Sequence, residues 1–249
     1  MDRIGKAFFF DLDGTLIDLD FDRLMPEYVQ LLGSHFADQL PLAKFTPAFL
    51  QAAAAMLAPV PWPLPDRAPN NGERFYREFT RLTGIPSEQM SGLVDGFYTR
   101  EFPTLRHLSH PIPEAPQLLA EARRRGWTIV LATQPIFPRV ALLERLRWGG
   151  LPPDAFDLIT SMEEFHATKP HPAYFYEVCE RIGIPPQRSI MVGNDWHDDM
   201  PARLAGLHTY LAEPYALHPD APAPTPDARG DLAHLYTLLT QGELDRWVS

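Results

Sequence analysis

Two carboxylates, one residue apart, directly follow an apolar run near the start of the chain. Residues 7–10 read Ala-Phe-Phe-Phe, without polar alternation, which predicts a strand buried on both faces of a parallel sheet. Asp11, Asp13 and Gly14 then indicate a turn at the carboxyl end of that strand, where open α/β sheets bind their ligands. Two carboxylates held there repel each other, so a cation, a proton or a cationic side chain must stabilise the pair. An Asp-rich turn that merely ends the strand is the alternative.

Polar residues also follow three later segments, at positions where further strands are expected to end. Each has a structural alternative, because Thr133 could cap a helix and Asp198 and Asp199 could lie in the first turn of one. Lys169 is harder to explain in this way. It is one of three lysines among 22 Lys and Arg residues, and lysine provides a compact point charge. The candidate residues at these strand ends are Thr133, Lys169, Asn194, Asp195, Asp198 and Asp199.

The spacing of apolar residues divides the chain into a helical stretch and an α/β stretch. Helical periodicity over residues 21–36 begins a segment in which no strand is expected. Thr46 is expected to cap its second helix, with Pro47 in the first helical position. From residue 111 onward strands alternate with helices, which predicts a doubly wound parallel sheet. The expected helices are 21–36, 46–57, 71–83, 87–101, 116–125, 138–148, 171–182, 200–205 and 231–239, and the expected strands are 7–10, 128–132, 156–160, 189–192 and 208–211.

One sheet must join the two flanks of the helical stretch, because the first strand precedes it and the other strands follow it. We therefore predict an α/β core domain formed by residues 1–17 and 111–249, and an all-helical cap domain formed by residues 18–110. The cap is expected to stand over the carboxyl edge of the sheet. Residues 16–20 and 107–113 are the predicted hinges, because such a cap must open to release product.

The composition argues against several classes of protein. A net charge of −10 argues against a dedicated nucleic-acid binder and against attachment to an anionic membrane surface. No apolar run approaches the ~20 residues needed to span a bilayer, and no signal peptide precedes the first strand. Cys179 is the only cysteine, which excludes an internal disulfide and argues against a Cys-based metal site. We expect a cytoplasmic protein. The sequence does not indicate whether it is a monomer or an oligomer.

Together, these segments resemble the haloacid dehalogenase-like hydrolase superfamily. Residues 11–15, Asp-Leu-Asp-Gly-Thr, resemble its first motif, and Thr133 resembles its second. Lys169-Pro170 resembles the third motif, and residues 193–199 resemble the fourth. The helical stretch is similar to the cap of the phosphoglycolate phosphatase-like members. The resemblance implies a Rossmann-like core with an inserted helical cap.

The resemblance further implies phosphoryl transfer through an aspartyl-phosphate intermediate. Asp11 would be the nucleophile, and Asp13 would be the general acid for the leaving alcohol and then the base for the attacking water. Thr133 would hydrogen-bond a phosphoryl oxygen, and Lys169 would offset the negative charge of nucleophile and phosphate. The implied function is Mg²⁺-dependent hydrolysis of small phosphorylated metabolites.

The implied Mg²⁺ ion requires hard oxygen ligands. These would be the Asp11 side chain, the Asp13 backbone carbonyl and Asp195. The fourth motif of the superfamily often has an aspartate directly after its glycine, where this chain has Asn194. We expect Asp195 to ligate the metal and Asp199 to act from behind it or through water. Asn194 as the source of the ligand oxygen is the alternative.

Other functions stay open at this point. A sugar-phosphate phosphomutase would carry the same motifs, because cap closure decides whether water enters, and a non-catalytic binding protein could keep the fold. The dehalogenase branch does not need Asp13, and the Schiff-base lysine of a phosphonatase would have to be Lys44. The residues that could either contact an anionic substrate tail or form a solvated helix face are Arg67, Asn70, Asn71, Arg74 and Arg77.

Overall fold

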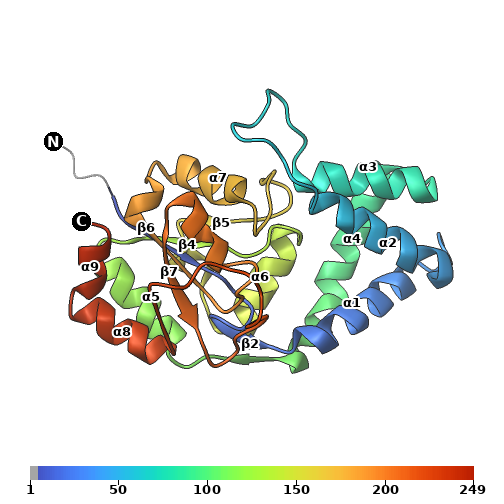
Figure 1. Cartoon of the computed structure of the whole chain (residues 1–249). Helices are drawn as coiled ribbons and strands as arrows, with labels where there is room; N and C mark the ends of the chain where they lie inside the picture. Colours follow the sequence, from blue (N-terminus) through green and yellow to red (C-terminus); the bar gives the residue numbers. More distant parts are fainter. Residues whose placement is uncertain (1–4) are drawn as a thin grey trace.

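The computed structural model describes residues 5–249 and shows a central sheet with a helical segment at one end (Figure 1). The six strands of this sheet are parallel to their neighbours, in the order β5-β4-β1-β6-β7-β8. The predicted doubly wound α/β fold is therefore confirmed. The strands are β1 (Ala7–Phe10), β4 (Thr128–Leu131), β5 (Leu158–Ile159), β6 (Ser189–Gly193), β7 (His208–Ala212) and β8 (Ala228–Gly230).

Successive residues of β1 belong to two different cores on opposite faces of the sheet. Phe8 and Phe10 lie in the larger core with residues of α5, α6 and α8, whereas Phe9 lies in the smaller core with residues of α7. This alternation follows from the two-residue period of a strand. All three rings are fully buried, which explains why the run contains no polar residue. The helices are α5 (Ala115–Arg124), α6 (Arg139–Trp148), α7 (Pro172–Ile182), α8 (Leu232–Thr240) and α9 (Glu243–Trp247).

The helical segment, residues 21–108, contains α1 (Phe21–His35), α2 (Leu42–Met56), α3 (Asn71–Thr83), α4 (Ser87–Arg100) and the 3₁₀-helix η1 (Phe102–Leu108). The predicted start of its second helix is wrong. α2 begins at Leu42, and Pro47 lies inside it. Phe45 and Phe49 belong to its buried stripe, and burial of Phe45, which precedes the proline, outweighs the one backbone hydrogen bond that the proline removes.

Two short strands connect the helical segment to the sheet. β2 (Ile17–Leu19) pairs antiparallel with β3 (Ser109–Pro111), with Asp18 opposite His110. Both predicted hinges thus contribute to one β-ribbon, and the expectation of no strand between residues 18 and 109 is wrong at its two ends. The division into a core and a cap domain at these positions stays a prediction.

The last part of the sheet also differs from the expectation. The helix expected over residues 200–205 is a short 3₁₀-helix, η4 (Met200–Ala205). Gly206 ends it in the left-handed conformation. β7 is not the last strand, since β8 follows at the edge of the sheet without an apolar run to signal it. Within the described part of the chain, no helix is long and apolar enough to cross a membrane.

Candidate active site

A cleft of about 1020 Å³ opens where β1, β4 and β6 end. These strands are adjacent. The chain runs from β1 to β4 and β5 on one side and then crosses to β6 on the other side of β1, and open α/β sheets bind ligands where the strand order reverses in this way. The structure brings all the sequence-predicted site residues into the lining of this one cleft. They are Asp11, Asp13, Thr133, Lys169, Asn194, Asp195, Asp198 and Asp199.

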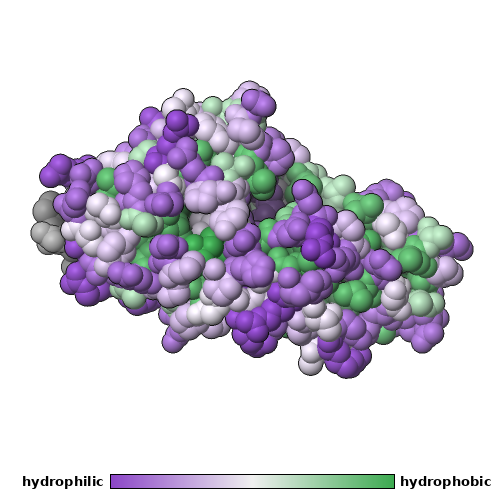
Figure 2. Space-filling view, turned by 90° about the horizontal axis from the view of Figure 1, so that it is seen from below, coloured by the Kyte–Doolittle hydropathy of each residue, from purple (hydrophilic) through white to green (hydrophobic). Residues whose placement is uncertain are grey.

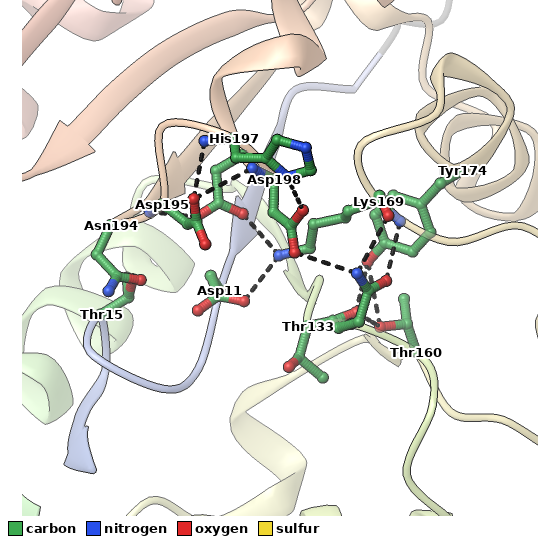
Figure 3. A network of polar contacts seen from close by, with 12 residues as sticks. Asp11, Thr15, Thr133, Thr160, Lys169, Tyr174, Asn194, Asp195, His197 and Asp198 are labelled. Carbon is green, nitrogen blue, oxygen red and sulfur yellow. Dashed lines mark hydrogen bonds and ion pairs between the residues drawn. The ribbon is translucent and has the colours of Figure 1, made fainter. Parts of the chain in front are cut away.

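Lys169 joins the first and the fourth of the predicted motifs (Figure 3). Its Nζ donates to Oδ1 of Asp11 and to Oδ1 of Asp199, both at 2.7 Å, and its side chain is 2% exposed. Burial alone lowers the pKa of Lys169, but the carboxylates of Asp11 and Asp199 outweigh burial and raise it well above its usual value. Lys169 is therefore a permanently charged cation beside the predicted nucleophile.

Asp199 is the more deeply buried of these two carboxylates, 1% exposed against 8% for Asp11. Its Oδ2 accepts a hydrogen bond from the backbone N–H of Asp195 at 2.9 Å. Burial raises the pKa of Asp199 to about 7, against the opposing charge of Lys169. A Cβ on Gly193 would lie 2.1 Å from the Asp199 carboxylate, so only glycine leaves room for it. Asp199 thus holds Lys169 in place from the side opposite Asp11.

Asp13 has a partner that the sequence did not predict. Its Oδ2 forms an ion pair with Nη1 of Arg145 on α6, whereas its Oδ1 is buried without a hydrogen bond. Burial raises the pKa of Asp13 to about 6, with Arg145 opposing the rise and Asp11 adding to it. A carboxyl group with this pKa can hold a proton near neutral pH, as a general acid must.

Arg145 is 1% exposed, and its guanidinium stacks over the ring of Phe137 at 4.5 Å. The sequence feature that could have indicated this residue is an arginine among the buried residues of α6, between Ala141 and Trp148. A charged residue at such a position is rarely buried unless it is paired. The sequence could therefore have indicated a buried ion pair but not its partner.

Thr133 lies at the end of β4 with its backbone fixed. Its carbonyl accepts hydrogen bonds from Thr160 at 2.8 Å and from Tyr174 at 3.0 Å. Its hydroxyl has no hydrogen-bond partner within residues 5–249 and lines the cleft, so it is available to a ligand. Gln134, which the sequence analysis missed, bonds the backbone of Lys169 at both N–H and carbonyl and also bonds Asp198.

Asn194 and Asp195 take different positions around Asp11 (Figure 3). Oδ1 of Asn194 accepts from the Thr15 hydroxyl at 3.2 Å, and its amide packs so closely on Gly14 that a Cβ there would lie 2.3 Å from Nδ2. Gly14 also has a φ of +77°, which favours glycine. The Asp195 carboxylate accepts from the backbone N–H of His197 at 2.8 Å and from Nδ1 of His218 at 2.9 Å.

His218 lies in the loop that follows β7, and no sequence pattern singled it out. Its hydrogen bond to Asp195, together with the charge of that carboxylate, raises the pKa of His218. The backbone of this loop also pairs with the fourth motif, because Leu217 donates to the carbonyl of Asn194 at 2.9 Å. The loop therefore closes one side of the cleft.

The cleft offers the oxygen ligands that Mg²⁺ prefers, although no cluster of three or more His, Cys, Asp or Glu side chains suited to a metal occurs in residues 5–249. The predicted set needs only two acidic side chains, since its third ligand is the Asp13 carbonyl. Asp11 uses Oδ1 for Lys169, and its Oδ2 makes no hydrogen bond or ion pair with the described residues. This free oxygen, with Asp195 or Asn194 beside it, fits a hard cation.

Of the two alternatives for the polar residues near α3, contact with an anionic substrate tail has no support, and a solvated helix face fails for Asn71 and Arg74, which are buried. None of the five residues considered, Arg67, Asn70, Asn71, Arg74 and Arg77, lines the cleft. Asn71 is fully buried and donates to the carbonyl of Pro135 at 2.9 Å, and Arg74 donates to Asn71 at 2.7 Å. These side chains fasten α3 to the loop after β4 instead of facing a ligand.

Comparisons with known proteins agree with the fold. The model of the haloacid dehalogenase-like hydrolase family matches residues 6–206. A phosphoserine phosphatase of Thermus thermophilus is 32% identical over 206 residues, 81% of this chain and 74% of that protein. A phosphoglycolate phosphatase of Xylella fastidiosa is 27% identical over 220 residues, 87% of this chain and 84% of that protein. The structure of a HAD phosphatase from Thermococcus onnurineus has the same fold, with a TM-score of 0.56 and 20% identity over 94% of this chain and 97% of that one.

Proposed function

We propose that this chain, which belongs to the haloacid dehalogenase-like hydrolases and is a phosphoric monoester hydrolase, uses Mg²⁺ and an aspartyl-phosphate intermediate. Its substrates are small phosphorylated compounds. The observation that carries the proposal is the contact of Asp11 with Lys169 at 2.7 Å, at the end of the central strand and beside a second carboxyl group, Asp13. A carboxylate is a weak nucleophile, and it attacks phosphorus only where cations mask the charge of the phosphoryl group.

The residues act in two steps. A carboxylate oxygen of Asp11 attacks phosphorus, the bond from phosphorus to the ester oxygen breaks, and Asp13 gives its proton to that oxygen. Water then attacks the aspartyl-phosphate and gives a proton to Asp13, which releases inorganic phosphate and restores Asp11. Lys169 and the Thr133 hydroxyl stabilise the phosphoryl oxygens in both steps. Bound Mg²⁺, on Asp11, the Asp13 carbonyl and Asp195, would supply further positive charge.

The test measures release of inorganic phosphate from a panel of phosphate monoesters, with Mg²⁺ and with EDTA. We expect Mg²⁺-dependent turnover, and we expect Asp11→Asn to reduce kcat by at least about 10⁴-fold because the covalent intermediate cannot form. Asp22→Asn, an exposed carboxylate at the mouth of the same cleft, is the matched control and should retain activity.

Three outcomes would contradict the proposal. An active Asp11→Asn variant would exclude the aspartyl-phosphate. Conversion of a sugar phosphate to its isomer without phosphate release would identify the mutase alternative. Thermal protection by Mg²⁺ without turnover of any monoester would identify a binding protein that keeps the fold.

A further inference from the structure

Exposed hydrophobic side chains gather at the mouth of the cleft. Among the described residues, the large hydrophobic side chains that are strongly exposed are Phe21, Leu42, Leu50, Leu57, Val140, Leu204, Tyr215 and Leu217. Half of them line the cleft, namely Phe21, Leu57, Tyr215 and Leu217, which we call the apolar rim. Single exposed hydrophobic residues are ordinary, but several around one opening indicate a contact surface.

The apolar rim comes from both sides of the cleft. Phe21 begins α1 and Leu57 follows the end of α2, whereas Tyr215 and Leu217 belong to the loop after β7. Figure 2 shows hydrophobic residues bordering a hollow near the middle of one face of the molecule. A ligand that reaches from the cleft floor toward solvent therefore meets apolar surface on both sides of the cleft.

Apolar surface also continues inward from the rim. Ile136 and Phe137 line the cleft, and the same two residues line a second cavity of about 60 Å³ inside the helical segment. The other residues around that cavity are hydrophobic or tyrosine side chains, including Tyr28 and Met25. Apolar surface is thus continuous from the cleft, across Ile136 and Phe137, to the interior of the helical segment.

The charges around the cleft disfavour a second anion on the substrate. Acidic residues outnumber Lys and Arg in the lining, and the outer ones are Asp18, Asp20, Asp22 and Glu213. Each Lys or Arg in the described lining already has a carboxylate partner. Lys169 pairs with Asp11 and Asp199, Arg145 pairs with Asp13, and Arg23 pairs with Glu27.

We infer that the leaving group of the preferred substrate is uncharged and carries an apolar body that lies against the apolar rim. This inference rests on the proposed function, because the phosphoryl group must be held on the cleft floor for the leaving group to reach the rim. The cleft, with a volume of about 1020 Å³, has room for such a body beside the phosphoryl group. The substrate class is therefore a monoester of an alcohol with at least several carbon atoms.

Straight-chain alkyl phosphates test this inference, because ethyl, butyl and hexyl alcohols are almost equally good leaving groups. Differences in kcat/KM along the series then report contacts of the chain. A fully buried methylene changes binding by up to about fourfold, so we expect kcat/KM for hexyl phosphate to exceed that for ethyl phosphate by at least about tenfold. Phosphoglycolate, an anionic counterpart of ethyl phosphate, should be no better than ethyl phosphate.

A matched pair of variants, one within α2 and one directly after it, assigns the preference to the rim. Leu57→Ser should reduce the hexyl-to-ethyl ratio by about threefold to fivefold. Leu50→Ser removes a leucine of similar exposure, 52% against 44%, that does not line the cleft, and it should leave the ratio unchanged.

The outcomes separate this inference from the proposed function. Turnover that depends on Asp11 but shows equal kcat/KM for ethyl and hexyl phosphate, or a clear preference for phosphoglycolate, would overturn the inference and leave the proposed function standing. An unchanged ratio in Leu57→Ser would also overturn it. Absence of turnover with every monoester would contradict both.

Discussion

The floor and the apolar rim of the cleft are built in opposite ways. On the floor, Asp11, Lys169 and Asp199 are buried and hold one another through hydrogen bonds of 2.7 Å. On the rim, the side chains of Phe21 and Leu57 are exposed. Charged groups act on a developing charge only where they are already oriented, whereas an apolar body needs only a surface that excludes water. The floor therefore determines the reaction, and the rim selects the leaving group.

The backbone at Leu57 of the rim is nevertheless held by hydrogen bonds. Arg74 donates to the carbonyls of Met56 and Ala58, on either side of Leu57, and Asn71 ties Arg74 to the loop after β4. The backbone of Leu57 is thus held while its side chain stays free. We therefore expect changes on the floor to abolish phosphate release, and changes behind the rim to reduce stability and the hexyl-to-ethyl ratio.

The largest loss of stability is expected from Lys169→Met, which breaks the floor. It leaves two buried carboxylates, Asp11 and Asp199, without their cation, so one must take a proton or the fold must open. We expect a loss of about 3–5 kcal/mol in the free energy of unfolding and of about 10³-fold in kcat. Urea denaturation and phosphate release measure the two quantities.

Two further variants test the reason for this loss. Lys169→Met combined with Asp199→Asn should recover part of the stability, since only one buried carboxylate then lacks a partner, but it should recover no turnover. Lys44→Met removes an exposed lysine of α2 and should change neither quantity. A stable, active Lys169→Met enzyme would show that the floor does not depend on this cation.

The second prediction concerns the fastening behind the rim. Asn71→Ala removes hydrogen bonds to Pro135 and Arg74 at a fully buried position and should reduce the free energy of unfolding by about 2–3 kcal/mol. kcat for ethyl phosphate should change less than twofold, whereas the hexyl-to-ethyl ratio should fall. Arg77→Ala, at an exposed position of the same helix, is the control. A large loss of kcat for ethyl phosphate would mean that floor and rim are not separable.

The third prediction separates the two candidate metal ligands on the floor. If Asp195 binds Mg²⁺, Asp195→Asn should raise the Mg²⁺ concentration for half-maximal activity by about 10–100-fold, and Asn194→Ala should raise it less. Thermal protection by Mg²⁺ should follow the same order. The reverse order would assign the ligand to Asn194.

More of the floor could be predicted from the sequence than of the residues that surround it. Asp11, Thr133 and Lys169 follow strand or loop segments in the order that parallel strands impose, so their meeting follows from topology. Arg145 reaches Asp13 from the middle of a helix, and His218 reaches Asp195 from a loop without a pattern. Such contacts depend on how α6 and the loop after β7 pack, which local spacing does not encode. The same limit applies to Asn71, whose partner lies 64 residues away.

The smallest effect of a single group is expected from Asp13 in the pH dependence of stability. It sharpens the difference between floor and rim, because of the two only the floor contains buried carboxyl groups with raised pKa values. Burial raises the pKa of Asp13 from 3.8 to about 6, so the folded chain binds this proton more tightly than the unfolded chain. The resulting stabilisation is fully present below pH 3.8 and is lost as the pH rises through 6. Between pH 5 and pH 8 the contribution of Asp13 changes by about 1.4 kcal/mol.

Asp199, whose pKa burial raises to about 7, acts with the same sign. The neighbouring arginines lower the pKa of Glu121 to about 2, so the contribution of Glu121 changes only below this pH range. Urea denaturation with EDTA present should therefore show greater stability at pH 5 than at pH 8, and Asp13→Asn should reduce the difference. Greater stability at pH 8 would mean that the pairing of Asp13 with Arg145 outweighs its burial.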